Sequence, residues 1–204
     1  MSVSAKKLLG SKENTMTVAV LQGMRVAILV RDGFLESELL EPKRALENAG
    51  AATFVVSGTG DRVRGRTEKN GQKDVPVDIP LNTARAEDFH ALLLPGGRSD
   101  QSVNIGEVQF VRHFMKAGKL VAAIGDGCET LLQAGTVRGC TMTSDPSLKS
   151  ELENAGTIWV DNDVVCDRNL ITSRTPDDIP AFNREMIRSF AEFREHSISM
   201  RKVY

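Results

Sequence analysis

The sequence is poor in cysteine and has no long apolar run. Its 204 residues include only three cysteines, Cys128, Cys140 and Cys166, which are far apart and form no closely spaced pair. This pattern argues against a disulfide framework or a zinc site and indicates a reducing compartment. No run approaches the roughly 18 apolar residues of a membrane helix, and residues 1–20 lack the apolar centre of a secretory signal. We therefore expect a cytoplasmic protein without membrane contact.

An excess of either charge is also missing. Lys and Arg total 26, Asp and Glu total 27, and the formal net charge is −1. Nothing in this balance attracts nucleic acid or an anionic membrane, so neither is an expected partner. The three histidines have no metal-ligand spacing with one another or with a cysteine. We expect no bound metal and no cofactor.

What is present is a regular alternation of apolar runs and helical periodicity, which predicts an α/β fold with a mostly parallel, doubly wound sheet. We divide the chain into a loosely ordered extension (1–23) with a short strand at 18–21, one domain (24–195) and a tail (196–204). A hairpin-like excursion is expected at 60–78. The predicted strands are 25–30, 53–56, 91–94, 120–124, 158–160, 164–166 and 170–172. The predicted helices are 36–49, 107–117, 147–155 and 179–195.

The sharpest local feature is the glycine turn at Gly125-Asp126-Gly127, between a buried strand and a helix. In α/β proteins such a corner points side chains into the crevice at the carboxyl ends of the strands. Asp126 is interpreted either as a helix cap or as a functional carboxylate. The pair Gly96-Gly97 also follows a strand, and it is either a plain turn or a source of backbone N–H donors for an oxyanion.

Two further side chains are candidates for chemistry at this crevice. Glu38 follows the first strand and is either a base near the glycine turn or a solvated helix carboxylate. Cys128 is expected in the first turn of a helix, where the macrodipole favours a thiolate. Cys140 and Cys166 fall in strand-like contexts and are expected in the core.

Several blocks together resemble the DJ-1/PfpI superfamily, over roughly 25–188. They include Asp32-Gly33-Phe34 with Glu38, Leu94-Pro95-Gly96-Gly97, Ala134-Gly135-Thr136-Val137-Arg138-Gly139, and the run from Thr172 to Phe182. The resemblance implies a flavodoxin-like three-layer α/β sandwich that forms dimers or larger assemblies. Activities assigned in the family include peptidase, glyoxalase, deglycase and holdase chaperone.

The chain departs from the family at its reactive centre. The family's elbow reads Ile-Cys-His-Gly, whereas this chain has Ile124-Gly125-Asp126-Gly127. The resemblance therefore puts Gly125 at the position of the nucleophile and Asp126 at that of its histidine. It also implies that Glu38 is the carboxylate partner, and that Gly96 and Gly97 are the backbone oxyanion donors.

Three hypotheses follow. The first is a non-catalytic, stress-related homo-oligomer, dimeric or larger, that acts as a chaperone or binds partner proteins. The second is a hydrolase or glyoxalase-type enzyme that uses the displaced thiol of Cys128 with Glu38 or Asp126, on a small carbonyl or peptide ligand. The third is a small-molecule or metal-binding module in which Glu38 and Asp126 meet across the pocket.

Overall fold

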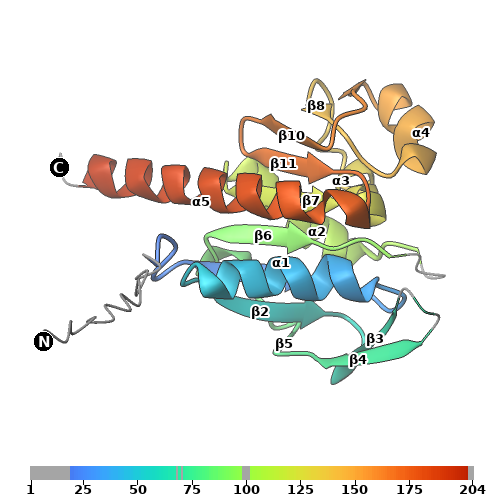
Figure 1. Cartoon of the computed structure of the whole chain (residues 1–204), viewed down its shortest axis with the longest axis horizontal. Coiled ribbons are helices and arrows are strands. Elements are labelled where there is room, and N and C mark those ends of the chain that lie inside the picture. Colours follow the sequence, from blue (N-terminus) through green and yellow to red (C-terminus); the bar gives the residue numbers. More distant parts are fainter. Residues whose placement is uncertain (1–18, 68, 70, 98–101, 202–204) are drawn as a thin grey trace, which may run out of the picture.

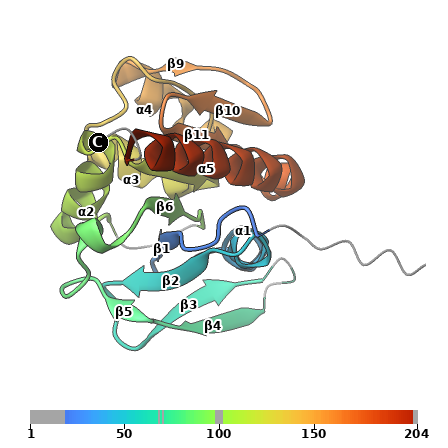
Figure 2. The same ribbon diagram turned by 90° about the vertical axis from the view of Figure 1, so that its left-hand side faces the viewer.

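The protein folds around one large sheet covered on both faces by helices. The computed structural model describes residues 19–67, 69, 71–97 and 102–201, with side chains through residue 195. The seven strands lie in the order β10-β11-β7-β6-β1-β2-β5. Helices α1 and α5 cover one face, whereas α2 and α3 lie on the other (Figures 1 and 2). The predicted three-layer α/β sandwich with a mostly parallel sheet is confirmed.

The strands of the main sheet are parallel except for β10, which pairs antiparallel with β11 at one edge. Continuous apolar runs form the central strands because both of their faces are buried. The main sheet consists of β1 (Arg25–Leu29), β2 (Ala52–Ser57), β5 (Ile79–Pro80), β6 (Ala91–Leu94), β7 (Leu120–Ile124), β10 (Val164–Asp167) and β11 (Leu170–Ser173). Two smaller ladders are the antiparallel hairpin of β3 (Arg62–Arg66) with β4 (Gln72–Pro76), and the parallel pair of β8 (Thr141–Met142) with β9 (Ile158–Trp159).

Within the described part of the chain, five α-helices connect or follow the strands. They are α1 (Glu36–Asn48), α2 (Ile105–Lys116), α3 (Cys128–Gln133), α4 (Lys149–Asn154) and α5 (Ile179–Arg201). Single 3-10 turns lie at Ala86–Asp88, Gly125–Gly127, Pro146–Leu148 and Pro176–Asp178. The predicted unit of strand, helix and parallel strand is confirmed. Helix α1 follows β1 in the chain and precedes β2, and these two strands pair in parallel.

The core consists of two clusters, one on each face of the sheet. The cluster under α1 and α5 includes Leu39, Phe182 and Phe190, all with no exposed area. The cluster under α2 and α3 includes Phe114 and Leu131, which are equally buried. The longer helices α1, α2 and α5 thus each contribute one apolar stripe to the core, as their sequence periodicity predicts.

Some boundaries differ from the sequence prediction. Helix α2 begins two residues early because Asn104 and Glu107 form a reciprocal capping box. The strand predicted at 18–21 is wrong over its described part: residues 20–23 form a turn that buries Leu21 completely, and Val18 lies outside the described residues. The two-residue strands β5 and β8 are too short to give a sequence signal.

Candidate functional site

The elbow between β7 and α3 is shaped by glycine. Gly125 has a φ of +62°, a backbone conformation that residues with a Cβ rarely adopt. Gly127 allows a close approach between two strand ends, because a Cβ there would lie 2.4 Å from the carbonyl oxygen of Leu94. The sequence therefore forms the sharp corner at the carboxyl end of β7, but no side chain extends from its tip.

The structure brings Glu38 to this corner. Glu38 lies in the first turn of α1 and is only 4% exposed. Both of its carboxylate oxygens lie 3.1 Å from the position that a Cβ on Gly125 would occupy. The helix start that carries it is tied down by a hydrogen bond from the N–H of Leu35 to the carbonyl of Gly96 (3.1 Å). Glu38 is therefore a buried elbow carboxylate and not a solvated one.

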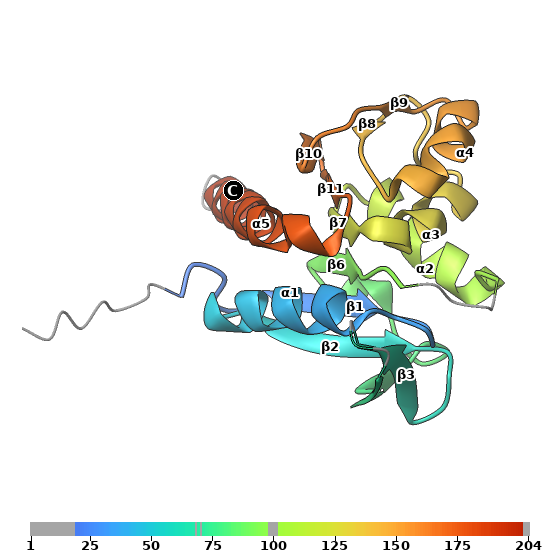
Figure 3. The same cartoon turned by 45° about the vertical axis from the view of Figure 1, so that its right-hand side comes forward.

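The β3–β4 hairpin fixes the loop that leads into Glu38. The N–H of Gly33 donates to the carbonyl of Arg64 (2.6 Å), and the N–H of Arg66 donates to the carbonyl of Phe34 (2.7 Å). Figure 3 shows the hairpin lying beside this end of α1. The excursion predicted at 60–78 thus contributes to the geometry of the crevice.

The carboxylate of Asp126 is bound by the backbone of the paired-glycine loop. It accepts a short hydrogen bond from the backbone N–H of Gly97, one of the two donors that the family resemblance implies. The interpretation of Asp126 as a helix cap is wrong, since neither the 3-10 turn nor α3 has a side-chain cap. Asp126 and Glu38 converge on Gly96: their nearest oxygens lie 2.7 and 2.3 Å from the position of a Cβ on that residue.

Carboxylates outnumber cations around the elbow. Burial raises the pKa of Asp126, Asp145 and Glu129 raise it further, and the hydrogen bond from Gly97 opposes them. Burial likewise raises the pKa of Glu107. Arg31 compensates part of this charge through an ion pair with Glu129 (3.0 Å) and a longer one with Glu107 (4.0 Å). The corner is therefore unfavourable for any additional negative charge.

Cys128, the displaced thiol considered from the sequence, is completely buried. Its side chain belongs to the core cluster under α2 and α3, and its S–H donates weakly to the carbonyl of Thr143 (3.6 Å). Burial raises the pKa of this thiol far above its ordinary value, and Asp126, Glu38 and Asp145 add to the effect. Desolvation thus outweighs the influence of the helix start, which the sequence analysis expected to favour a thiolate. Of the other two thiols, Cys140 is buried as predicted, but Cys166 is exposed, so its predicted core position is wrong.

The cavity beside the elbow is small. It measures about 20 Å³ and is lined by Arg31, Phe34, Gly97, Glu107, Asp126 and Thr130, among others. That volume suffices for about one water molecule. The corner in this conformation has room for a solvent molecule and not for a peptide or a sugar.

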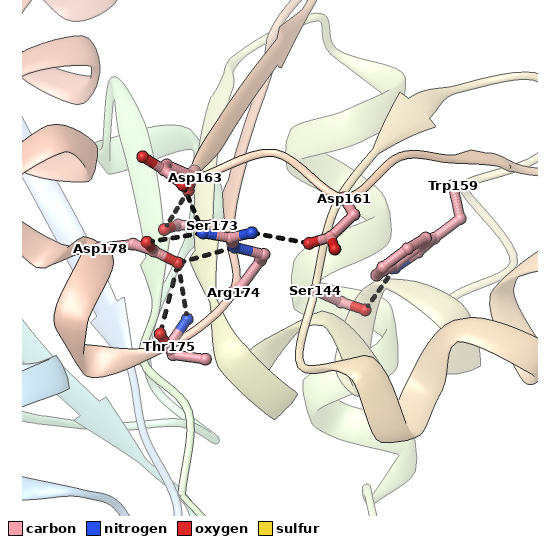
Figure 4. Close-up of polar contacts among 8 residues, drawn as sticks. All are labelled: Ser144, Trp159, Asp161, Asp163, Ser173, Arg174, Thr175 and Asp178. Carbon is pink, nitrogen blue, oxygen red and sulfur yellow. Dashed lines mark hydrogen bonds and ion pairs between the residues drawn. The ribbon is translucent and has the colours of Figure 1, made fainter.

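Sequence reasoning missed two arginines that lie just beyond the carboxyl ends of strands. Arg31 lies two residues past the end of β1 and Arg174 directly follows β11, so the rule that functional residues follow parallel strands applies to both. Arg174 donates to Asp178 (3.0 Å), Asp161 (2.6 Å) and Asp163 (Figure 4). It thereby joins the loop between β9 and β10 to the 3-10 turn that begins α5.

An α/β sandwich in which a glycine elbow, a buried glutamate and a paired-glycine loop meet at one corner of the sheet is the architecture that the sequence resemblance predicts. The DJ-1/PfpI family model matches residues 24–189, and the chain belongs to this family. It is 40% identical over 169 residues to general stress protein 18 of Bacillus subtilis, covering 81% of this chain and 96% of that protein. An uncharacterized protein from Staphylococcus epidermidis is 39% identical, covering 80% of this chain and 96% of the relative.

Solved structures agree with this assignment. DJ-1beta from Drosophila melanogaster superposes with a TM-score of 0.69 at 28% identity, covering 82% of this chain and 90% of that one. A two-domain protein from Anabaena variabilis, with DJ-1/ThiJ/PfpI-like and ferritin-like domains, gives a TM-score of 0.75 at 29% identity. That match covers 80% of this chain and 47% of the two-domain protein.

Proposed function

We propose that this protein is a non-catalytic member of the DJ-1/PfpI family that acts in stress protection by binding other polypeptides as a homo-oligomer. The observation that supports the loss of catalysis most strongly is the pair of changes at the elbow. Gly125 provides no nucleophile, and Asp126 occupies the N–H of Gly97 that would stabilise an oxyanion. Nucleophile and oxyanion site are both needed for acyl transfer.

Electrostatics add a second argument against nucleophilic catalysis at this corner. A tetrahedral oxyanion formed there would stand beside the carboxylate of Asp126, which already accepts the hydrogen bond of the Gly97 N–H. An ionised carboxylate at this position repels the negative charge of an oxyanion and offers it no hydrogen-bond donor. The proposal therefore does not depend on the missing sulfur alone.

The enzyme hypothesis with Cys128 receives little support from the geometry. A nucleophile must reach its substrate, and this sulfur has no exposed area and a strongly raised pKa. The ligand-module hypothesis at the same corner is limited by the small cavity, although Glu38 and Asp126 do converge there.

The role in stress protection rests on the relationship to general stress protein 18. A cytoplasmic location agrees with the three free cysteines. Among the described residues, no helix has both the length and the apolar character needed to cross a membrane. Dimers or larger assemblies remain part of the proposal.

The test compares three forms of the protein in three assays. Wild type, Cys128→Ala and Gly125→Cys/Asp126→His are assayed for peptide hydrolysis, for methylglyoxal consumption and for suppression of aggregation of a heated client enzyme. The proposal expects no turnover by wild type or Cys128→Ala, and suppression of aggregation by both. Light scattering should show an oligomer.

Two results would contradict the proposal in different ways. Turnover by wild type that disappears in Cys128→Ala would establish the displaced thiol as a nucleophile. Neither turnover nor any effect on the client, from a folded wild-type protein, would remove the chaperone-like role while leaving the loss of catalysis in place.

A further inference from the structure

A large groove of the described molecule lies away from the elbow. It has a volume of about 840 Å³ and runs between the end of β2, the segment that follows β5 and the helix α2. None of its lining residues lines the small cavity at Asp126. Small-molecule sites typically occupy about 300–1,000 Å³, so this groove has the size that the elbow cavity lacks.

Three carboxamide side chains line the groove from two different parts of the chain. Asn82 belongs to the segment after β5, Asn104 is the N-cap of α2, and Gln109 lies in the second turn of that helix. The oxygen of Asn104 accepts from the N–H of Glu107 (3.0 Å), which leaves its NH₂ group facing Gly58, where a Cβ would lie 3.5 Å away. Asn82 and Gln109 are exposed. A carboxamide offers both a donor and an acceptor, so such groups recognise ligands that carry both.

The remaining lining favours a ligand without net charge. Arg85 contributes a positive charge, whereas Asp61 and Glu87 contribute negative ones. The imidazole of His113 lies 3.6 Å from the carboxylate of Glu87. Pro80 and Leu81, which are exposed and half-buried, provide apolar surface within the same groove, against which the C–H face of a small ring can pack.

An extended peptide fits the groove less well. The adjacent edge strand β5 ends at Pro80, which has no backbone N–H to donate to an added strand. The carbonyl of Pro80 is already used by the N–H groups of Thr83 and Ala84, both at 3.0 Å. The sheet edge beside the groove therefore offers little of the backbone ladder by which extended peptides bind.

We propose that this groove binds an uncharged, hydroxyl-rich small molecule of the size of a mono- or disaccharide. Its hydroxyl groups would exchange hydrogen bonds with Asn82, Asn104 and Gln109, and its apolar face would cover Pro80 and Leu81. This site is separate from the elbow and does not depend on the proposed loss of catalysis.

The test measures binding of D-glucose and maltose to the full chain by saturation-transfer NMR and calorimetry. The proposal expects saturable millimolar binding of at least one of them, weakened about tenfold by Gln109→Ala and by Asn82→Ala. Both positions are exposed, so these variants should fold. Gln72→Ala, which removes an exposed carboxamide from β4 outside the groove, is the matched control and should bind like wild type.

Several outcomes would overturn the inference. These are the absence of saturable binding of both sugars in the millimolar range, equal binding by wild type and the two groove variants, or weakening by Gln72→Ala to the same extent. Binding of neutral tetraalanine amide with no binding of the sugars would identify the groove as a peptide site and would equally exclude the proposal.

Discussion

A side chain on Gly125 would begin 3.1 Å from both carboxylate oxygens of Glu38. The buried glutamate thus directly faces the elbow glycine, which the sequence resemblance places at the position of the family's nucleophile. That contact is tight enough that a Cβ would require Glu38 to move by a few tenths of an ångström, and the positive φ of Gly125 adds strain for any other residue.

The first prediction concerns this strain. Gly125→Ala should lower the free energy of unfolding by about 1–2 kcal/mol, because alanine is disfavoured in the left-handed region and its methyl group approaches Glu38. Urea denaturation measures the effect. Gly118→Ala is the control for φ alone, since Gly118 also has a positive φ (+64°) but nothing within 4 Å of its Cβ position. A smaller loss at residue 125 than at residue 118 would contradict the crowding by Glu38.

The second prediction concerns the restored elbow. Gly125→Cys/Asp126→His places a thiol beside Glu38, removes one carboxylate and frees the N–H of Gly97. Iodoacetamide should label residue 125 faster in this double variant than in Gly125→Cys, where Asp126 still disfavours a thiolate. Peptide mapping separates this label from that on exposed Cys166. A folded double variant that labels no faster than the single one would argue against a retained catalytic frame.

The third prediction concerns Cys128. In the native protein this thiol should resist iodoacetamide while Cys166 reacts, because only Cys166 is exposed. Cys128→Ala should lower the free energy of unfolding by about 1–2 kcal/mol through lost core packing. Cys166→Ala is the matched control and should stay within about 0.5 kcal/mol of wild type. Rapid labelling of Cys128 in folded protein would reopen the enzyme hypothesis.

The fourth prediction is a pH dependence. Burial raises the pKa of folded Asp126 above its unfolded value of about 3.9. Stability from this group is therefore fully present below the unfolded pKa and is lost as the pH rises through the raised one. Wild type should lose stability relative to Asp126→Asn as the pH increases over this range, measured by urea denaturation at several pH values.

Asp178 provides a control of opposite sign. Arg174 holds the pKa of Asp178 below its ordinary value, so its contribution is present above the unfolded pKa and is lost as the pH falls. Wild type should therefore gain stability relative to Asp178→Asn as the pH rises. The difference in free energy of unfolding between wild type and variant should therefore change with pH in opposite directions for Asp126→Asn and Asp178→Asn. The same change for both variants would contradict the environments that the structure gives these two carboxylates.

The fifth prediction concerns Arg174. Its guanidinium bonds three aspartates and is 23% exposed, whereas Arg188 pairs with Glu185 and Glu192 on α5 and is 55% exposed. Arg174→Met should therefore lower the urea midpoint more than Arg188→Met. Arg174→Lys should recover only part of the loss, because an ammonium cannot reproduce the forked donor geometry. Equal midpoints for the two methionine variants would show that the network contributes no more than an ordinary surface pair.

Much of the fold could be predicted from the sequence. A strand that is buried on both faces of a sheet gives a continuous apolar run, such as that at 91–94, whereas a helix that is buried on one face gives an apolar residue every three or four positions. The alternation of these two patterns along the chain identifies a doubly wound sheet. Residues that break a run, such as Gly118 after α2, place its end within a residue or two. Short pairings such as β5 and β8 leave no period to detect. The earlier start of α2 was signalled by Asn104 followed three residues later by Glu107, a capping-box spacing that the periodicity alone does not include.

The sequence by itself determined that the elbow has no side chain at Gly125 and that Glu38, Asp126 and the Gly96-Gly97 pair lie near one edge of the sheet. Only the tertiary structure decided what these groups do there. It buried Cys128, turned the carboxylate of Asp126 onto the N–H of Gly97 and concentrated carboxylates at the corner. These features depend on distances between segments far apart in the chain, and on which side chains lose their water when those segments pack.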